Sequence, residues 1–193
     1  MTRDRQAQPN ILILCMDQWQ THMDLPDDVN FPAMERLEAQ GTTFDRHYCT
    51  TPICTPSRAT MWTGMHAKQT GAYENTNNAW IEGLSQDIPT IGHMLRDQGY
   101  YTAFKGKWHL SWLEHSEDAL EPYGFSDFQQ WGEMYGAPLE GAKLDGTVAF
   151  ETVDWLQTKA PALDRPWLLV SSIVNPHDIM KAPSTTTKQP SST

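Results

Sequence analysis

Short runs of apolar residues recur along the chain, and each of them predicts a strand. Ile11–Met16 is continuously apolar and ends at the polar residue Asp17. Such a run is typical of a strand that is buried on both faces of a parallel sheet. Strands are also predicted at residues 100–104 and 166–174, and residues 42–48 are a candidate for a further strand.

Segments with helical spacing or helix-end signals separate these runs. Helices are predicted at residues 31–40, 89–98 and 144–158. Pro32 suits the first turn of the first helix, while Gly41 and Gly99 suit the ends of the first two. Strands that alternate with helices predict an α/β fold, with a largely parallel central sheet flanked by helices.

Two segments depart from this pattern. Residues 110–138 are rich in Trp, Gly, Glu and Asp, and they predict a long excursion from the sheet. Residues 182–193 are mostly Ser, Thr and Pro, and they predict a disordered tail. We therefore expect one folded portion over residues 1–181, without an internal repeat, followed by this tail.

The charge of the chain narrows the classes of partner. The 193 residues include 24 Asp and Glu but only 14 Lys and Arg, so the formal net charge is 14 − 24 = −10. Nonspecific nucleic-acid binding needs clustered positive charge, and attraction to anionic membranes needs the same, so both are disfavoured. An anionic substrate needs only a local cationic pocket.

The number of cysteines and the length of the apolar runs indicate the cellular compartment. Three cysteines are too few for a disulfide framework. The N-terminal residues are polar, and the first apolar run is too short for a signal or membrane segment. We therefore expect a cytoplasmic location and no membrane association.

Polar residues follow three of the predicted strands. They are Asp17-Gln18, Lys107-Trp108-His109 and His177-Asp178. In parallel sheets, ligands bind where the carboxyl ends of the strands meet. One such cluster alone is best interpreted as the start of a solvated loop, but three together favour a functional site.

The residues around Cys54 predict a helix with a cysteine at its start. Pro56 is placed for the first turn of a helix that runs to about Gly64. Free N–H groups at a helix start favour an anion and would lower the pKa of a thiol. Arg58 lies one turn further on and can bind an oxyanion. The residues alone leave open a nucleophile in an oxyanion pocket and an inert cysteine at a helix end.

Four motifs resemble those of a known family, in the same order along the chain. Residues 54–58 read Cys-Thr-Pro-Ser-Arg, are followed by Thr63-Gly64, and resemble the signature of the type I sulfatases. Residues 9–18, 106–110 and 175–178 resemble the family's first strand, its Gly-Lys-Trp-His block and its Pro-His block. The resemblance implies an alkaline-phosphatase-like fold and hydrolysis of sulfate monoesters, as in the arylsulfatases.

The resemblance also implies a modified nucleophile and a metal ion. Cys54 would be oxidised by a formylglycine-generating enzyme, and the aldehyde hydrate would be both nucleophile and metal ligand. Asp17 would bind a divalent cation, usually Ca²⁺ in this family, with Mg²⁺ and Mn²⁺ as alternatives; hard cations take oxygen ligands. Gln18 stands where many members have a second Asp, and its amide oxygen would be an uncharged ligand.

Further roles are implied for four side chains. Arg58 would hold residue 54. Lys107 and His109 would contact the hydrate and the sulfate, and His177 would lie near the sulfate or the leaving group. One hydroxyl of the hydrate would attack sulfur and expel the alcohol of a sulfated small molecule or carbohydrate. The second hydroxyl would then lose its proton to a base such as His109, and sulfate would leave.

Departures from the family pattern keep alternatives open. Family members are much longer, and nothing after Asp178 matches their later metal ligands or lysine. We therefore expect the N-terminal part of a catalytic domain, with slow turnover or none, or else a non-catalytic remnant. The Asp-Gln pair at residues 17–18 also occurs in a subgroup that includes choline-sulfatase-like and phosphonate monoester hydrolase-like enzymes, which leaves a phosphonate or phosphate ester hydrolase as the other alternative. An oligomer is compatible with all of these.

The remaining candidate ligands have no motif around them. A zinc pair of Cys49 and Cys54 is disfavoured, because no second cysteine pair follows. Trp19 and Trp80 are candidates for pocket walls. Histidines that are expected at the surface or in the core are His22, His47, His66, His93 and His115.

Overall fold

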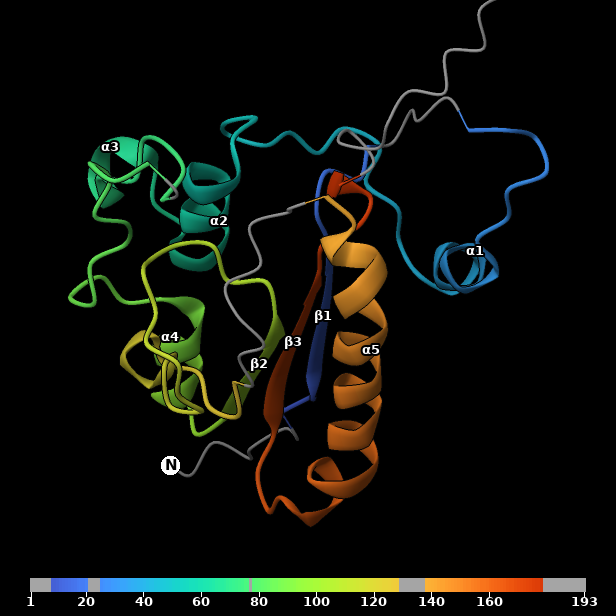
Figure 1. Ribbon diagram of the computed structural model, residues 1–193. Coiled ribbons are helices and arrows are strands. Elements are labelled where there is room, and N and C mark those ends of the chain that lie inside the picture. The colour runs from blue at the N-terminus through green and yellow to red at the C-terminus, as the bar shows by residue number, and fades with distance from the viewer. Residues whose placement is uncertain (1–7, 21–24, 77, 129–137, 179–193) are drawn as a thin grey trace, which may run out of the picture.

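The computed structural model describes residues 8–20, 25–76, 78–128 and 138–178 (Figure 1). In chain order these residues form β1 (Ile11–Met16), α1 (Pro32–Gln40), α2 (Cys54–Thr63), α3 (Ala67–Thr70), α4 (Ile91–Arg96), β2 (Tyr101–Gly106), the 3₁₀ helix η1 (Glu121–Tyr123), α5 (Glu140–Thr158), the 3₁₀ helix η2 (Ala160–Ala162) and β3 (Trp167–Ile173). The predicted tail, His22 and residues 129–137 of the predicted excursion lie outside the described residues.

The strands form one parallel sheet in the order β1-β3-β2. Leu12 of β1 and Ala103 of β2 both lie opposite Leu169 of β3. Parallel neighbours need long crossover connections, and here these contain the helices. The predicted α/β fold with a parallel sheet is confirmed.

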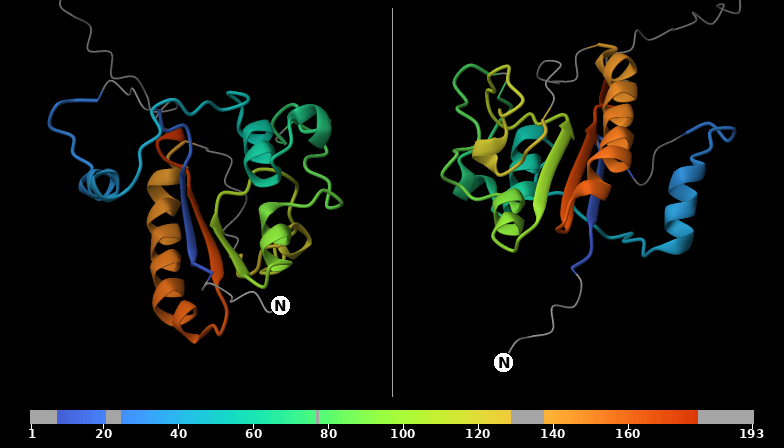
Figure 2. Two further views of the ribbon diagram at one scale, coloured as in Figure 1. Left: turned by 180° about the vertical axis from the view of Figure 1, so that it is seen from behind. Right: turned by 90° about the horizontal axis from the view of Figure 1, so that it is seen from below.

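Helices cover both faces of the sheet, with α5 on one side and α2 and α4 on the other (Figure 2). Successive side chains of a strand point to opposite faces. Leu168 and Val170 of β3 therefore enter the core on the α2 side, whereas Leu169 packs with Trp155 of α5. No helix in the described ranges is both long and apolar enough to cross a membrane.

Aromatic rings join β2 to α2 and to the loop that follows β2. The Phe104 ring makes edge contacts with Trp62, Trp108 and Phe125, at centroid distances of 5.7, 5.5 and 5.4 Å. All four side chains are buried. Edge-to-face pairs of this kind stabilise beyond the area that they bury, so they hold the carboxyl end of β2 in place.

The described part of the predicted excursion, residues 110–128, packs back on the sheet. Leu110, Leu120 and Phe125 are fully buried. The Phe104 amide donates to the Ser126 carbonyl (3.2 Å), and the Ser126 amide donates to the Thr102 carbonyl (2.8 Å). This segment therefore belongs to the core on the α2 side.

Two predictions for the N-terminal third are wrong. Residues 42–48 form no strand, and Phe44 and Tyr48 are exposed, because no strand within the described ranges pairs with this segment. β1 is not buried on both faces: Leu12 and Leu14 are 41% and 57% exposed. β1 lies at the edge of the described sheet, and only its other face packs on the core, through Ile11 and Ile13.

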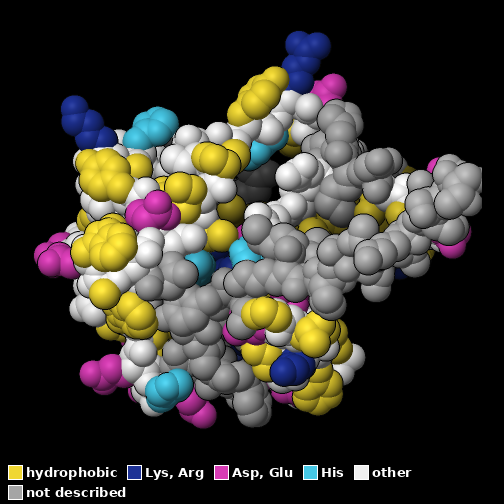
Figure 3. Space-filling view, turned by 45° about the horizontal axis from the view of Figure 1, so that its top comes forward, with side chains coloured by type: hydrophobic (Ala, Val, Ile, Leu, Met, Phe, Trp, Pro, Cys, Tyr) yellow, Lys and Arg dark blue, Asp and Glu magenta, His cyan; other side chains and the backbone are white. Residues whose placement is uncertain are grey.

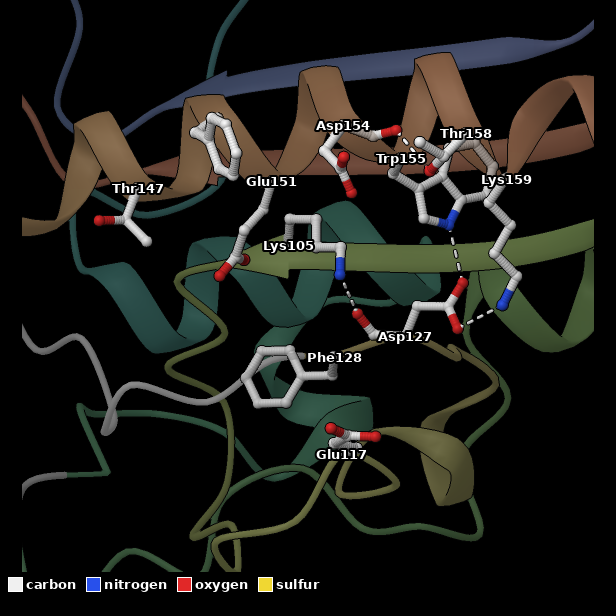
Figure 4. A pocket seen from close by; sticks show the side chains of 11 residues that line it. Lys105, Glu117, Asp127, Phe128, Thr147, Glu151, Asp154, Trp155, Thr158 and Lys159 are labelled. Atoms are coloured by element: carbon white, nitrogen blue, oxygen red, sulfur yellow. Dashed lines mark hydrogen bonds and ion pairs between the residues drawn. The ribbon is translucent and has the colours of Figure 1, made fainter.

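A cavity of about 560 Å³ lies between β2 and α5 (Figure 4). The Asp127 carboxylate accepts hydrogen bonds from Trp155 Nε1 (2.7 Å) and Lys159 Nζ (2.6 Å) there. Lys105 Nζ donates to the Asp127 carbonyl (2.5 Å). Lys105 projects to the α5 side of the sheet, so this cavity is separate from the motif residues, none of which lines it.

Truncation of a buried ring should destabilise the fold. Trp108 is fully buried among Phe104, Tyr123 and Phe125. We expect Trp108→Ala to lower the free energy of unfolding by about 3–5 kcal/mol, because it leaves a large cavity. Urea denaturation measures this. Trp80 is 77% exposed, so Trp80→Ala is the control and should change stability by less than about 0.5 kcal/mol. Equal losses in both variants would contradict the packing described.

Candidate functional site

The polar clusters that follow the strands meet at one edge of the sheet, as the sequence predicts. Asp17 follows β1, Lys107 follows β2 and His177 lies shortly after β3, while Cys54 begins α2. Ligand atoms of Asp17, Cys54 and His177 all lie within 4.8 Å of one another. Figure 3 views this edge, where histidine side chains and a Lys or Arg surface lie near the centre of the face.

Asp17 is the central anion of this cluster. Its Oδ2 lies 2.5 Å from Lys107 Nζ and 3.5 Å from Arg58 Nη2, and all three side chains are at least 90% buried. Burial raises the pKa of the Asp17 carboxyl, but the positive charges of Arg58 and Lys107 lower it more, so the net pKa lies below its usual value. Asp17 is therefore a buried carboxylate that is balanced by two cations.

Cys54 faces this carboxylate from the start of α2. Its Sγ lies 3.9 Å from both carboxylate oxygens of Asp17. Burial and the negative charge of Asp17 raise the pKa of the Cys54 thiol, and together they outweigh Lys107 and Arg58. The lowered thiol pKa expected from the helix start is therefore wrong. Such a thiol is a poor thiolate nucleophile.

Arg58 joins α2 to the sheet. Its Nη1 donates to the Lys107 carbonyl (2.8 Å) and to Ser172 Oγ (3.0 Å). The predicted helix end is confirmed, since Gly64 adopts φ 72° and its amide donates to the Thr60 carbonyl (2.8 Å). Because helix and sheet are joined in this way, the guanidinium reaches Asp17 at a fixed position.

The segment after β2 places Lys107 and His109 in the interior. Gly106 adopts φ 88°, and a Cβ there would collide with the Ser172 carbonyl. The turn lets the Lys107 amide donate to that same carbonyl (2.8 Å). Lys107 and His109 are 0% and 1% exposed. Sequence motif and structure therefore agree on a glycine directly before the buried lysine.

His109 is held neutral in this environment. Burial, followed by the positive charges of Lys107 and Arg58, lowers its pKa to about 3. Its backbone adopts φ 52°, in the left-handed region, which costs a residue other than glycine about 1–3 kcal/mol. Surrounding contacts must stabilise this conformation.

His177 and Asp178 have different surroundings. His177 is buried, and its ring is near Asp17 and Cys54. Asp178 Oδ2 instead accepts from the Gly141 amide of α5 (3.0 Å). Asp145 of α5 accepts from the amides of Val174 and Asn175, at 2.7 and 2.9 Å. The two carboxylates thus bind α5 to the end of β3 and support the position of His177.

Gln18 is exposed, with φ 62°, and lines a cavity of about 280 Å³ together with Asp17 and Cys54. Trp19 and Cys49 line the same cavity. In the described part of the chain, Asp17, Cys54 and His177 form the group of His, Cys, Asp or Glu side chains that could hold a metal ion. A zinc pair at Cys49 gains no support from it.

The other candidate residues lie away from the cluster. His47, His115 and Trp80 are exposed. His93 Nδ1 accepts from the Thr90 amide (3.1 Å) at the start of α4, and His66 is the N-terminal cap of α3. These histidines have the surface and structural roles that were predicted for them.

Four supporting residues were missed by sequence reasoning. They are Thr55, Asn75, Asp145 and Ser172. Ser172 had a weak signal, because it is a polar residue within an apolar strand. Asn75 had none, since its contact with α2 joins residues 20 apart in the sequence.

Comparisons of the sequence with known proteins point to one family. A family model described as Sulfatase matches residues 9–192. A choline-sulfatase of Rhizobium meliloti is 29% identical over 204 residues, which cover 89% of this chain and 39% of that protein.

Solved structures show the same fold. A 2-O GAG sulfatase has a TM-score of 0.67 at 22% identity, with 96% of this chain and 40% of that one covered. A phosphonate monoester hydrolase of Agrobacterium radiobacter has a TM-score of 0.59 at 20% identity, with 88% and 41% covered. The chain therefore spans about two fifths of the length of these proteins.

Removal of a buried cation should unbalance Asp17. Lys107→Met leaves the carboxylate with Arg58 alone, so we expect the pKa of Asp17 to rise and the free energy of unfolding at pH 7 to fall by about 3 kcal/mol. Carboxyl NMR titration and urea denaturation in EDTA buffer measure the two effects. Lys143 is exposed on α5, and Lys143→Met is the matched control.

The pH dependence follows from the sign of the pKa change. In the wild type the folded-state pKa of Asp17 lies below its unfolded value, so its contribution to stability is present above about pH 3.9 and is lost as the pH falls through the folded pKa. In Lys107→Met this acid-side loss should begin at higher pH. An unchanged pKa of Asp17 would contradict the charge balance described.

Proposed function

The chain belongs to the sulfatase family, and we propose that it supplies the nucleophile and the anion-binding groups of a sulfuric-ester hydrolase. The observation that carries the proposal is the buried cluster in which Lys107 and Arg58 lie against Asp17, with Cys54 at 3.9 Å from the same carboxylate. A sulfate monoester needs a nucleophile beside fixed cations, and this cluster supports that arrangement.

Conversion of Cys54 to formylglycine would supply the nucleophilic oxygen. The raised pKa of the Cys54 thiol makes direct thiolate attack a poor alternative. The residues that the converting enzyme would read, Cys54, Pro56 and Arg58, all lie in α2. A formylglycine-generating enzyme is therefore the proposed partner in maturation.

Lys107 and Arg58 would balance charge on the transferring sulfate group. Both are almost fully buried, so their fields are weakly screened by water. Arg58 is held by hydrogen bonds to Ser172 Oγ and the Lys107 carbonyl, and Lys107 by the hydrogen bond of its amide to the Ser172 carbonyl and its ion pair with Asp17, before any substrate arrives. Fixed charges of this kind need little reorganisation when charge develops.

His109 and His177 are the proposed proton-transfer groups. The pKa of His109, lowered to about 3, leaves its imidazole neutral at working pH but a weak base, so the proposed role requires the negative charge of a bound sulfate to raise that pKa. His177 lies beside Cys54 and Asp17 and would face the leaving group. These roles rest on position and charge state.

The donor set suits a divalent cation in part. Asp17 offers a carboxylate, Gln18 an amide oxygen, and residue 54 would offer an oxygen after conversion; these are ligands that Ca²⁺ accepts. Asp17 already binds a cation, the Lys107 ammonium, at 2.5 Å. A bound cation would act as a Lewis acid toward oxygen. Mg²⁺ and Mn²⁺ also take oxygen ligands.

The proposed substrates are sulfate esters of small molecules or carbohydrates. The choline-sulfatase and the 2-O GAG sulfatase reported above support this range by name. Phosphonate monoester hydrolysis is the second candidate, because Asp17-Gln18 is the pair found in that subgroup and one such enzyme shares the fold. Release of the aryl alcohol from aryl sulfate and from aryl phosphonate, under equal conditions, distinguishes the two.

Conversion of Cys54 is testable by mass spectrometry. After co-expression with an active formylglycine-generating enzyme, we expect the Cys54 peptide to lose about 18 Da, as the thiol becomes an aldehyde. The Cys49 peptide from the same digest is the internal control and should keep its mass. Pro56→Ala should reduce conversion. An unmodified Cys54 peptide would remove the proposed nucleophile.

The aldehyde hydrate has one hydroxyl for attack and a second for release of sulfate, so a variant with a single hydroxyl should trap the sulfated intermediate. Cys54→Ser offers one hydroxyl for attack but lacks the second that would release sulfate. Incubated with aryl sulfate and Ca²⁺, this variant should release at most one equivalent of aryl alcohol and gain about 80 Da on the residue 54 peptide.

The converted wild type and Cys54→Ala are the controls for this experiment. The wild type should release aryl alcohol without accumulating the adduct, and Cys54→Ala should do neither. Alcohol release by Cys54→Ala equal to that of the wild type would place the chemistry elsewhere. No release by any form would favour the non-catalytic alternative.

A further inference from the structure

Helix α2 contacts the segment after β2 at two backbone carbonyls. Arg58 Nη1 donates to the Lys107 carbonyl (2.8 Å), and Thr55 Oγ1 donates to the His109 carbonyl (2.9 Å). We propose that Thr55 is a positioning residue: its hydroxyl holds His109 in the left-handed conformation that directs its side chain into the site.

The spacing of the two contacts suits a helix beside an extended segment. Residues three apart on a helix lie on the same face, so Thr55 and Arg58 face the loop together. Positions two apart in an extended segment face the same way. The carbonyls of Lys107 and His109 can therefore accept from Arg58 and Thr55, respectively, at the same time. The helix that begins with Cys54 therefore holds both residues that carry the buried lysine and histidine side chains.

The Thr55 hydroxyl has a defined direction. It donates to the His109 carbonyl and accepts from the Thr76 amide (3.3 Å), while the Thr55 amide donates to Asn75 Oδ1 (3.0 Å). Thr55 is 0% exposed, so water cannot replace these partners. A hydroxyl bound on both sides cannot rotate freely, and the His109 carbonyl is fixed accordingly.

His109 needs such support. Its φ of 52° is unfavourable for a residue with a Cβ, and a carbonyl without its donor would be free to turn toward the common right-handed or extended regions. Since the ring of His109 is buried beside two cations, a turn of the backbone would move the ring out of register with Lys107.

Substitution of Thr55 tests the contact between α2 and the His109 carbonyl without changing any charged residue of the site. Arg58 also binds Asp17 and Ser172, so its loss would disturb several contacts at once. Thr55 is not among the residues that the converting enzyme would read, so its substitution keeps Cys54, Pro56 and Arg58. A catalytic role for the hydrogen bond between Thr55 and His109 rests on the proposed function. The hydrogen bond itself can be measured without any turnover of substrate.

The test is NMR on the full chain with Thr55→Val, which keeps the shape and removes the hydroxyl. We expect the backbone carbon shifts of His109 to lose their left-handed signature. The Thr76 amide should exchange about tenfold faster, as for loss of one buried hydrogen bond. Thr55→Ser keeps the hydroxyl and should restore both signals.

Thr63→Val is the matched control. Thr63 is also a buried threonine of α2, at the other end of the helix, and its hydroxyl donates to the Ala59 carbonyl (2.6 Å) and accepts from the Met65 amide (3.1 Å), away from the loop. This variant should lower stability without changing the His109 signature. It thus separates loss of a buried hydroxyl from loss of the contact with His109.

If Thr55→Val folds, three results would overturn the proposal. They are an unchanged His109 signature in Thr55→Val, an equal change in Thr63→Val, and failure of Thr55→Ser to restore the signals. If Thr55→Val does not fold, the wild type and Thr55→Ser still decide. In both proteins, the Thr76 amide must be protected from hydrogen exchange, and the backbone carbon shifts of His109 must show the left-handed conformation. Rapid exchange of the Thr76 amide in the wild type would refute the contact. Absence of sulfatase activity changes none of these readouts.

Discussion

The site depends on one buried carboxylate, Asp17, and on the two cations that make its burial tolerable. Neither a lone carboxylate nor a lone ammonium is stable away from water. Lys107 and Arg58 come from different elements, so charge balance at Asp17 requires β1, β2 and α2 to be in place together. Folding and assembly of the site are therefore the same event for this part of the chain.

Local patterns predicted much of the fold because they report local physics. The apolar runs located β1, β2 and β3, and Pro56 with Gly64 located α2, since strand burial and helix ends depend on nearby residues. Residues 42–48 failed because a strand also needs a partner strand, which no local pattern encodes.

The convergence of the site residues could be predicted for the same reason, from the rule that parallel strands end at one edge. Their supporting contacts could not. The raised thiol pKa of Cys54 depends on its burial and on how close Asp17 lies, and the hydrogen bond between Thr55 and His109 joins residues 54 apart in sequence. Such distances are set by packing of the whole core, so spacing in the chain carries no signal for them.

The cations Lys107 and Arg58 lie in the interior of a chain whose formal net charge is −10. An anion at long range therefore meets a repulsive field, and only at contact does it meet an attractive one. Added salt screens charges beyond roughly 8–10 Å but acts weakly on buried groups. Association of the proposed sulfate ester with this chain should thus become faster with rising ionic strength, which is the reverse of electrostatic steering by a basic surface.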